Sequence, residues 1–332
     1  MEALLGKTLT ELQDVALSVG LQKFAGKQLA EWLYVKRVTS FDQMTNISLK
    51  GREALQAKYT IGRHAPIREA VSIDGTKKYL FEVGEQFIES VYIPEDNRAT
   101  LCVSTQAGCK MGCRFCMTGT LGFHGHLSAA DILNQIFYFD DLTNVVFMGE
   151  GEPMDNLDHV LRALEIMTAD YGCAWSPKRI TVSTVGIPAM KRFLEQSECH
   201  LAVSMHNPFA IERKEIMPAE KLLSITDIVA LLKQYDWSHQ RRVSFEYICW
   251  AGQNDTPRHA KELLRLLKGL PCRINLIRFH AGVDRAFPAS DEKQMEWFRD
   301  YLTDNGITTT IRKSRGEDIL AACGMLVNSL TR

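Results

Sequence analysis

Short apolar runs rich in β-branched residues alternate with amphipathic helical stretches from about residue 100 onward in this chain of 332 residues. In chain order the runs are TLCVST, NVVFMG, RITVST, HLAVSM, RVSFEYI, RINLIRF and ITTTIR. Strands that alternate with helices predict a parallel sheet with right-handed crossovers. Because there are six or seven such strands, we expect an α/β fold, a partial (β/α)6 barrel rather than an open doubly wound sheet. Either architecture places the active site at the carboxyl ends of the strands.

The chain that precedes these runs has a different pattern. Residues 1–60 carry short amphipathic helical patterns such as LTELQDVALSVG and GKQLAEWLYVKR. The next stretch, KKYLFEVGEQFIESVYIPE, has a strand-like period that predicts a β-hairpin. We therefore expect a small helical accessory domain over residues 1–70, a hairpin and linker over 71–98, and the barrel with a C-terminal extension over 99–332.

Polar clusters follow the predicted strands at the point where each strand ends. A cysteine-rich loop follows the first barrel strand, and GEGEP (residues 149–153) follows the second. Ser183 ends the third strand, and SMH (residues 204–206) ends the fourth. Because the carboxyl ends of parallel strands meet at one edge, these clusters predict one shared pocket.

Composition restricts where such a chain works. The N-terminal MEALLGKTLTELQDVALSVG contains acidic residues and no long apolar run, so it predicts neither a signal peptide nor a membrane span. We expect a cytoplasmic protein, in which nine cysteines are metal ligands, catalytic thiols or core residues rather than disulfide partners. The net charge of −1 argues against a globally basic nucleic-acid binder but not against local basic patches.

Three cysteines in the loop after the first barrel strand are spaced C-x3-C-x2-C, at Cys109, Cys113 and Cys116. Three thiolates on one short loop can hold three irons of a [4Fe–4S] cluster and leave the fourth iron open to a small chelating ligand. The alternatives are unrelated core cysteines, or a zinc site completed by His124, His126 or Cys102. Structural zinc usually pairs one C-x2-C with a distant second pair, which this chain lacks, so the spacing favours the cluster.

The cysteine spacing, with Phe115 just before the last cysteine, resembles the signature of the radical S-adenosylmethionine superfamily. The resemblance implies that the open iron chelates S-adenosylmethionine, which is then cleaved to a 5′-deoxyadenosyl radical. GEGEP resembles the motif that receives the methionine amino group, with Gly151 and Glu152 as partners. The partial barrel is the usual fold of this superfamily.

Longer segments are similar to the RNA adenine C2 methyltransferases within that superfamily. They are ESVYIPEDNRATLCVSTQAGCKMGCRFC, NVVFMGEGEP, LAVSMHNP, FEYI, GQNDT and RKSRGEDILAACG, and the N-terminal EWLYVKRVTSFDQMTNISLKGREAL resembles the family's accessory domain. The resemblance implies methylation of the C2 carbon of an adenosine in the peptidyl transferase centre of 23S rRNA, and of a tRNA anticodon-loop adenosine. It also implies that the accessory domain binds RNA. C8-methylating relatives share much of the pattern and are the first alternative, and a non-catalytic RNA-binding or zinc-structural protein is the second.

The resemblance assigns three catalytic roles. Cys323 matches the residue that takes a methyl group and carries it as S-methylcysteine, and Cys102 matches the thiol that resolves the protein–RNA adduct. Their transient disulfide would be reopened by a cytosolic reductant. Glu89 matches the family's proton acceptor. Without the resemblance, Cys323 would be interpreted as a small buried residue and Glu89 as a solvated strand glutamate.

The resemblance also implies a set of cofactor contacts. The matching residues are Gly151, Glu152, Ser183, Ser204, Met205, His206 and His280. Two positions depart from the family pattern: Glu150 stands where methionine is usual and would place an extra carboxylate beside the cofactor, and His280 replaces a cofactor-contacting asparagine. The resemblance further implies two S-adenosylmethionine molecules per turnover, a flavodoxin-like electron donor, no membrane partner and a monomer.

Overall fold

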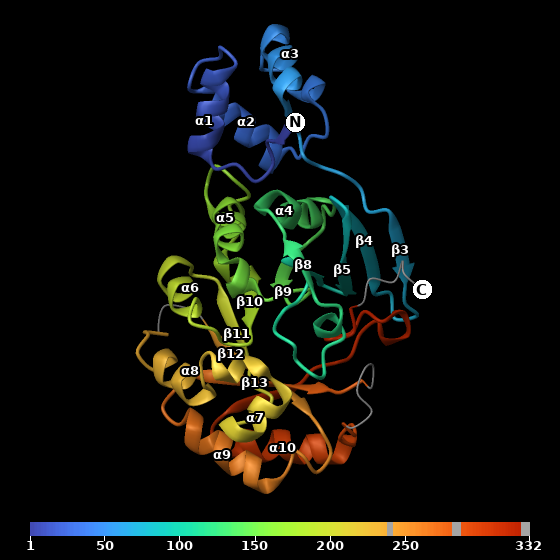
Figure 1. Cartoon of the computed structure of the whole chain (residues 1–332), viewed down its shortest axis with the longest axis vertical. Helices are drawn as coiled ribbons and strands as arrows, with labels where there is room; N and C mark the ends of the chain where they lie inside the picture. Colours follow the sequence, from blue (N-terminus) through green and yellow to red (C-terminus); the bar gives the residue numbers. More distant parts are fainter. Residues whose placement is uncertain (238–241, 281–286, 327–332) are drawn as a thin grey trace.

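The computed structural model describes residues 1–237, 242–280 and 287–326, and its centre is a ten-stranded sheet (Figure 1). The strand order is β14-β13-β12-β11-β10-β9-β6-β5-β4-β3. Six parallel pairings join β6 to β14 in sequence order without a reversal, which confirms the predicted α/β partial barrel. The parallel strands are β6 (Arg98–Cys102), β9 (Asn144–Phe147), β10 (Ile180–Thr184), β11 (His200–Ser204), β12 (Val243–Cys249), β13 (Cys272–Arg278) and β14 (Thr308–Ile311).

Helices connect these strands and cover the outside of the sheet (Figure 1). They begin where the sequence supplies caps: the Ser128 hydroxyl accepts a hydrogen bond from the Asp131 N–H and thereby starts α4. Over residues 1–237, 242–280 and 287–326, none of the helices combines the length and apolar content that a membrane crossing requires. The helices are α4 (Ala129–Phe137), α5 (Leu157–Thr168), α6 (Met190–Gln196), α7 (Ala210–Ile216), α8 (Ile225–Leu232), α9 (Pro257–Leu267) and α10 (Glu292–Asp304).

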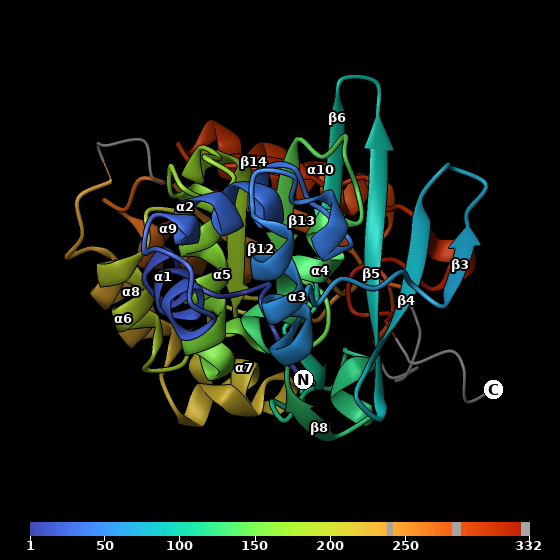
Figure 2. The same ribbon diagram turned by 90° about the horizontal axis from the view of Figure 1, so that it is seen from above.

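Three antiparallel strands extend the sheet beyond β6. They are β3 (Arg68–Val71), β4 (Lys77–Val83) and β5 (Gln86–Glu95), and β4 and β5 form the predicted hairpin. Because β5 pairs directly with β6, the hairpin is continuous with the main sheet. The β5–β6 turn projects beyond the rest of the barrel (Figure 2).

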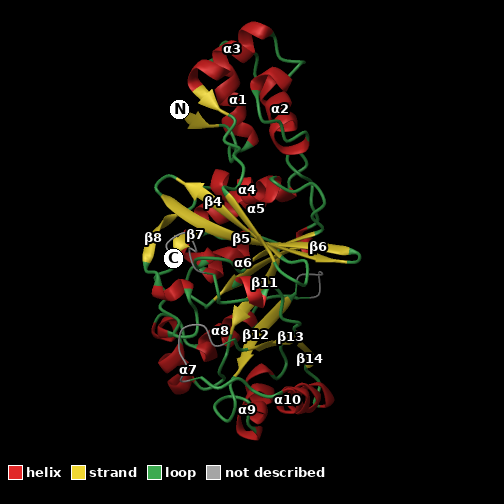
Figure 3. Ribbon diagram, turned by 90° about the vertical axis from the view of Figure 1, so that its right-hand side faces the viewer, coloured by secondary structure: helices red, strands yellow, loops and turns green. Residues whose placement is uncertain are grey.

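The N-terminal helices form a separate lobe at one end of the molecule (Figures 1 and 3). The lobe contains α1 (Leu9–Ser18), α2 (Ala25–Ala30), a π-helical turn (Glu31–Val35) and α3 (Leu49–Lys58), and its short strands β1 (Glu2–Ala3) and β2 (Tyr59–Thr60) pair in parallel. Arg63 lies in the segment that follows β2. Its guanidinium donates to the carbonyl of Phe137 at the end of α4, at 2.6 Å, and thereby fastens this segment to the barrel.

The segment after β14 folds back onto the loop after β6. The Met117 N–H donates to the Gly324 carbonyl (2.8 Å), and the Thr118 hydroxyl donates to the Leu326 carbonyl (2.9 Å). On its other side the Asp318 carboxylate accepts the Ile73 N–H at 3.1 Å, which fastens the segment to the β3–β4 turn. These contacts bring the far C-terminal part of the chain to the carboxyl edge of the sheet.

Candidate active site

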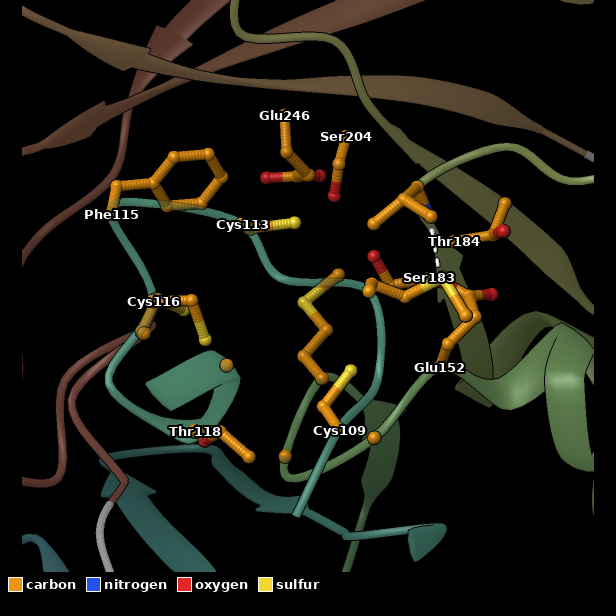
Figure 4. Close-up of a pocket in the computed structure, with 18 of the residues that line it drawn as sticks. Cys109, Cys113, Phe115, Cys116, Thr118, Glu152, Ser183, Thr184, Ser204 and Glu246 are labelled. Atoms are coloured by element: carbon orange, nitrogen blue, oxygen red, sulfur yellow. Dashed lines mark hydrogen bonds between the residues drawn. The ribbon is translucent and has the colours of Figure 1, made fainter. Parts of the chain in front are cut away.

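A cavity of about 140 Å³ lies at the carboxyl ends of the parallel strands, where the polar clusters were predicted to meet (Figure 4). Its walls come from the cysteine loop, from the ends of β9 to β12 and from the C-terminal segment. The structure therefore brings together side chains that are more than 200 residues apart in the sequence. The predicted residues that line it are Cys109, Cys113, Cys116, Gly151, Glu152, Ser183, Ser204, His206 and Cys323.

The three loop cysteines fit an iron–sulfur cluster. Their loop runs between β7 (Gln106–Gly108) and β8 (Phe123–His126), and the Cys109 N–H donates to the Gly122 carbonyl across its base. Within the described residues, no three His, Cys, Asp or Glu side chains converge on a point where one metal ion could sit. Three thiols that line one cavity suit a cluster, in which each thiol binds a different iron.

Because the thiols of the three loop cysteines are buried, their deprotonated thiolate forms are unfavourable without a bound metal. It raises the pKa of Cys109 to about 12 and also raises the pKa values of Cys113 and Cys116. Thiolates at such a site are stabilised by bound metal, because a coordinating cation favours the deprotonated ligand. The donor set therefore fits the cluster chemically as well as geometrically.

The GEGEP turn places a rigid carboxylate on the cavity wall. Gly151 has φ +96°, and a Cβ there would lie 2.5 Å from the Cβ of Gln106, so only glycine fits. The Glu152 carboxylate accepts the Met154 N–H (3.0 Å) and the Val185 N–H (2.8 Å). Burial raises the pKa of Glu152 to about 7, against these hydrogen bonds. The arrangement can receive an ammonium group, whose positive charge favours the ionised carboxylate.

His206 presents a neutral imidazole to the cavity. Its Nδ1 accepts the Ile248 N–H at 3.1 Å, so the ring proton of the neutral form is on Nε2. Burial, with the nearby Arg213 guanidinium, lowers the pKa of His206 to about 3. The ring also packs edge-on against Phe115, with 4.7 Å between ring centres. His206 can therefore donate one hydrogen bond but carries no charge near neutral pH.

Two predicted cofactor contacts lie elsewhere. Met205 is buried in the core and is not among the residues that line the cavity. His280 lines a neighbouring cavity, where its Nε2 is hydrogen-bonded to the Ser314 hydroxyl and its Nδ1 lies 2.9 Å from the Glu317 carboxylate. A cofactor contact through either side chain stays a prediction.

The neighbouring cavity, of about 230 Å³, contains both of the thiols predicted to react with each other. Cys102 ends β6, and Cys323 lines this cavity as well as the first one. All nine cysteines are free thiols in this structure. Burial raises the pKa of Cys102 to about 12. Cys323 has an exposed surface, yet the protein packed around its thiol raises its pKa while Arg312 acts in the opposite direction.

Glu89 is fully buried, so the alternative of a solvated strand glutamate is wrong. Its carboxylate lies 3.0 Å from the Lys78 ammonium. Glu89 lines a third cavity, of about 220 Å³, together with Leu320 of the C-terminal segment, rather than either cavity that contains Cys323. Its role as proton acceptor stays a prediction.

That Glu150 puts a carboxylate beside the cofactor stays a prediction; in the structure its charge acts on the nearby Cys116 thiol and contributes, in addition to burial, to the raised pKa of that cysteine. Glu150 is buried and does not line the cofactor cavity. Its carboxylate instead accepts the Glu89 N–H (2.8 Å) and the Gly108 N–H (3.2 Å). The direction of the side chain follows from these two backbone donors, which the sequence could not reveal.

Stability should depend on pH through Glu150. Burial raises its pKa from 4.5 to about 8; Glu89 adds to this, and the two N–H donors and Lys78 oppose it. The folded protein then holds a proton that the unfolded chain releases between these values, so the free energy of unfolding falls as pH rises through the window. In the Glu150→Gln variant, the free energy of unfolding should fall less steeply with pH than in the wild type, by up to about 1.4 kcal/mol per pH unit. Urea unfolding at pH 6 and pH 8 measures the difference. Parallel pH profiles for the two proteins would contradict the assignment.

Two charged residues of the site were missed by sequence reasoning. Glu246 lines the first cavity, beside the cysteine loop, from β12. Arg312 lines the neighbouring cavity, just after β14. Their Oε2 and Nη1 atoms are 3.7 Å apart. The sequence did contain a signal for Glu246, which is an acidic residue inside the apolar run RVSFEYI. An acidic residue in a buried strand needs a partner, so its presence there indicates a functional or paired carboxylate.

The four remaining cysteines lie away from both thiol cavities. They are Cys173, Cys199, Cys249 and Cys272, and all are buried or half-buried.

Comparison with known proteins is consistent with this geometry. A family model described as the radical SAM superfamily matches residues 103–276, and one described as the ribosomal RNA large subunit methyltransferase N-terminal domain matches residues 3–61. A protein of Bacteroides thetaiotaomicron named "Probable dual-specificity RNA methyltransferase RlmN" is 60% identical, over 97% of this chain and 95% of the relative. The "Dual-specificity RNA methyltransferase RlmN" of Alcanivorax borkumensis is 38% identical, over 98% and 90%.

A solved structure supports the same relationship. The crystal structure of a radical SAM methyltransferase from Sphaerobacter thermophilus matches with a TM-score of 0.92 and 34% sequence identity, over 98% of this chain and 99% of that one. Sequence and fold thus agree over nearly the whole length, including the lobe and the cysteine loop. The chain therefore belongs to the dual-specificity RNA methyltransferase family of the radical S-adenosylmethionine superfamily.

Proposed function

We propose that this enzyme methylates the C2 carbon of an adenosine in the peptidyl transferase centre of 23S rRNA and of an adenosine in a tRNA anticodon loop. One observation carries the proposal: Cys323 lines both the cavity of the three cluster cysteines and the cavity that contains Cys102. A thiol in that position can meet the cofactor on one side and a nucleobase on the other. This is what a residue needs in order to carry a methyl group between them.

The residues of the first cavity hold the two cofactors of the family. Cys109, Cys113 and Cys116 bind the [4Fe–4S] cluster, while Gly151 and Glu152 receive the amino group of S-adenosylmethionine. When bound, these cofactors supply a methyl group and a hydrogen-abstracting radical. The apolar walls around Phe115 and Ile248 restrict water near that reactive chemistry.

The two thiols handle the carbon unit. We propose that Cys323, as a thiolate, takes the methyl group by displacement, with S-adenosylhomocysteine as the leaving group. Once a hydrogen atom has been removed from this methyl group, its carbon bonds to C2 of the RNA base; the C2 proton goes to a base, and the surplus electron would return to the cluster that supplied it. The Cys102 thiolate then attacks the sulfur of Cys323, and the bond between that sulfur and the bridging carbon breaks. The carbon keeps the bonding electron pair and takes up a proton, which completes the new methyl group, and a Cys102–Cys323 disulfide remains. A cytosolic thiol reductant reduces this disulfide before the next turnover. Glu89, beside the segment that carries Cys323, is our candidate acceptor for the C2 proton.

A basic rim around the second cavity supports an RNA substrate. The protein has a net charge of −1, yet this cavity is lined by Arg98, Arg278, Arg312, Lys313 and Arg315. Among the residues that the structure describes, the acidic partners of Arg278, Arg312 and Arg315 lie 3.7 Å away, so these ion pairs are loose. A rim of this kind attracts the phosphates that flank a base entering the cavity.

Removing rim charges should weaken RNA binding in a salt-dependent way. The variant Arg278→Ala/Lys313→Ala should lower the slope of log K against log salt by about 0.7–0.9 for each phosphate contact that is lost. A filter-binding titration with substrate RNA at several salt concentrations measures it. The matched control, Arg265→Ala/Lys191→Ala, removes exposed charges on α9 and α6 and should leave the slope unchanged. An equal slope in the rim variant would contradict the proposed RNA path.

The product decides between C2 and C8 chemistry. Mass spectrometry of 23S rRNA and tRNA from a strain that lacks the gene should show loss of 2-methyladenosine, restored by the wild-type chain and not by Cys323→Ala. Loss of 8-methyladenosine instead would contradict the C2 assignment. We further propose a flavodoxin-like electron donor, a cytoplasmic location and a monomeric enzyme, the last of which sedimentation would test.

A further inference from the structure

Lys78 is a buried lysine on β4 to which the proposed function gives no role. Its ammonium lies 3.0 Å from the carboxylate of Glu89, which is fully buried as well. Taking both charges out of water is costly, and apolar residues of similar volume often stabilise a fold equally well. A buried ion pair of this kind therefore needs a reason other than stability.

The sheet register places this ion pair beside the thiol that is proposed to resolve the adduct. Cys102 lies directly opposite Val91 in the antiparallel pairing of β5 with β6. Glu89 is two positions from Val91 along β5, so its side chain is on the same face of the sheet as Cys102. Diagonal neighbours of this kind lie about 7–8 Å apart. Ala321 of the C-terminal segment packs on the same face, against Val91 and Cys102.

Lys78 also contacts the C-terminal segment. Its ammonium donates to the Leu320 carbonyl at 3.4 Å, three positions before Cys323. Lys78, Glu89 and Leu320 line the third cavity together. Because an ammonium group has three N–H donors, it can hold the carboxylate and the carbonyl at the same time. One side chain thus connects the proposed proton acceptor with the segment that carries the proposed methyl carrier.

The other charged groups around Glu89 make a cation necessary. The Glu150 carboxylate accepts the Glu89 N–H at 2.8 Å, so a second buried acidic group lies close by. Asp318 and Arg68 line the same cavity, and Arg68 is an exposed residue. Burial and neighbouring carboxylates both favour the protonated form of a carboxyl group, which cannot accept a proton. An ammonium at 3.0 Å opposes these effects and favours the ionised form.

We infer that Lys78 is a positioning residue for the removal of the C2 proton, because it keeps Glu89 ionised and fixes it relative to the C-terminal segment. The inference rests on the proposed function, in which Glu89 accepts that proton. In this step the C2–H bond breaks and its electron pair stays in the adenine ring. The proton goes to the Glu89 carboxylate, which becomes a neutral carboxylic acid. Lys78 remains an ammonium throughout and exchanges no proton with the RNA.

The test follows two steps of the reaction separately. Enzyme reconstituted without oxygen is mixed with S-adenosylmethionine and an rRNA fragment deuterated at C2 of the target adenosine. Mass spectrometry then records methylation of Cys323 and loss of deuterium from C2. Lys78→Met should methylate Cys323 within about threefold of the wild-type rate, because no C2 proton moves in that step. Its loss of deuterium should be at least about 100-fold slower and should need a pH at least about one unit higher.

Three further variants serve as comparisons. Lys77→Met removes the neighbouring lysine, which is 3.1 Å from Glu69 on the partly exposed side of β4, and should leave both steps unchanged. Lys78→Arg keeps a cation and should keep the wild-type pH dependence of deuterium loss. Glu89→Gln should lose deuterium slowly, and adding Lys78→Met to it should slow that loss by less than about threefold, because Lys78 acts through Glu89. The double variant leaves neither charge buried without its partner.

The outcomes separate the inference from the proposed function. Equal slowing of both steps in Lys78→Met would show that Lys78 only anchors the C-terminal segment, and would overturn the inference. A shift of the Lys78→Arg profile to higher pH, or a further large loss in the double variant, would also overturn it. If Glu89→Gln is slow but Lys78→Met is not, the inference alone fails. If the wild type keeps the deuterium, or Glu89→Gln loses it at the wild-type rate, the C2 assignment or the proton acceptor is wrong and the inference fails with it.

Discussion

Replacing Cys102 with alanine is expected to leave the enzyme covalently joined to its RNA instead of releasing product. Cys102 and Cys323 line the same cavity, so Cys102 is positioned to attack the sulfur that carries the bridging carbon. Without that attack, the bond between Cys323 and the RNA base has no thiol to break it. Multiple turnover should fall by at least about 10³-fold, since the resolving nucleophile is lost. Denaturing gel electrophoresis with labelled RNA measures the adduct.

The partner substitution gives the matched control. Cys323→Ala should form no adduct, because the thiol that makes the bond is missing, and it should also be inactive. Cys272→Ala, at a half-buried cysteine outside both thiol cavities, should turn over like the wild type. Equal trapping by the Cys102 and Cys323 variants, or trapping by neither, would refute the roles proposed for the two thiols.

Loss of one loop cysteine should remove the cluster and with it all methylation. Wild-type protein reconstituted without oxygen should bind about four irons per chain. Cys109→Ala should bind fewer than about one iron per chain, because the two remaining cysteines are too few ligands to retain the cubane. Iron analysis and the visible absorption of the brown protein provide the measurement.

The zinc alternative makes the opposite prediction. If the loop held zinc, the reconstituted wild-type protein would be colourless and zinc analysis would account for the bound metal. Cys173→Ala, a substitution outside the cavity, should keep the full iron content and thereby show that loss of any one cysteine is not enough.

The fold was predictable because its signals are local. Each parallel strand is a short apolar run between amphipathic helices, and the Ser128 cap shows how one such helix begins at a residue that the sequence marks. The three cysteines proposed to bind the cluster could be selected for the same reason, since they lie within eight positions of one loop. Their assignment required only the spacing and the place of the loop after a strand.

The parts that could not be predicted depend on contacts between distant segments. Cys323 looks like a small core residue until hydrogen bonds from Met117 and Thr118 bring its segment to the cysteine loop. The direction of the Glu150 carboxylate is set by the N–H groups of Glu89 and Gly108, which are 61 and 42 positions away in the sequence. Glu246 reaches the cavity through the register of three strands, which no local pattern of residues encodes.

The contacts that fasten the C-terminal segment also determine when the enzyme becomes reactive during its own synthesis. On the ribosome, the whole parallel sheet and the cysteine loop are made before residue 323 is added. A nascent chain at that stage has Cys102 but not Cys323, the thiol that we propose carries carbon to RNA. In the complete chain Cys102 is only 8% exposed, because Ala321 and Leu326 of the C-terminal segment pack around it, so its shielding also waits for that segment. Translation thus adds the proposed methyl carrier after the sheet and the cysteine loop that it contacts in the folded protein.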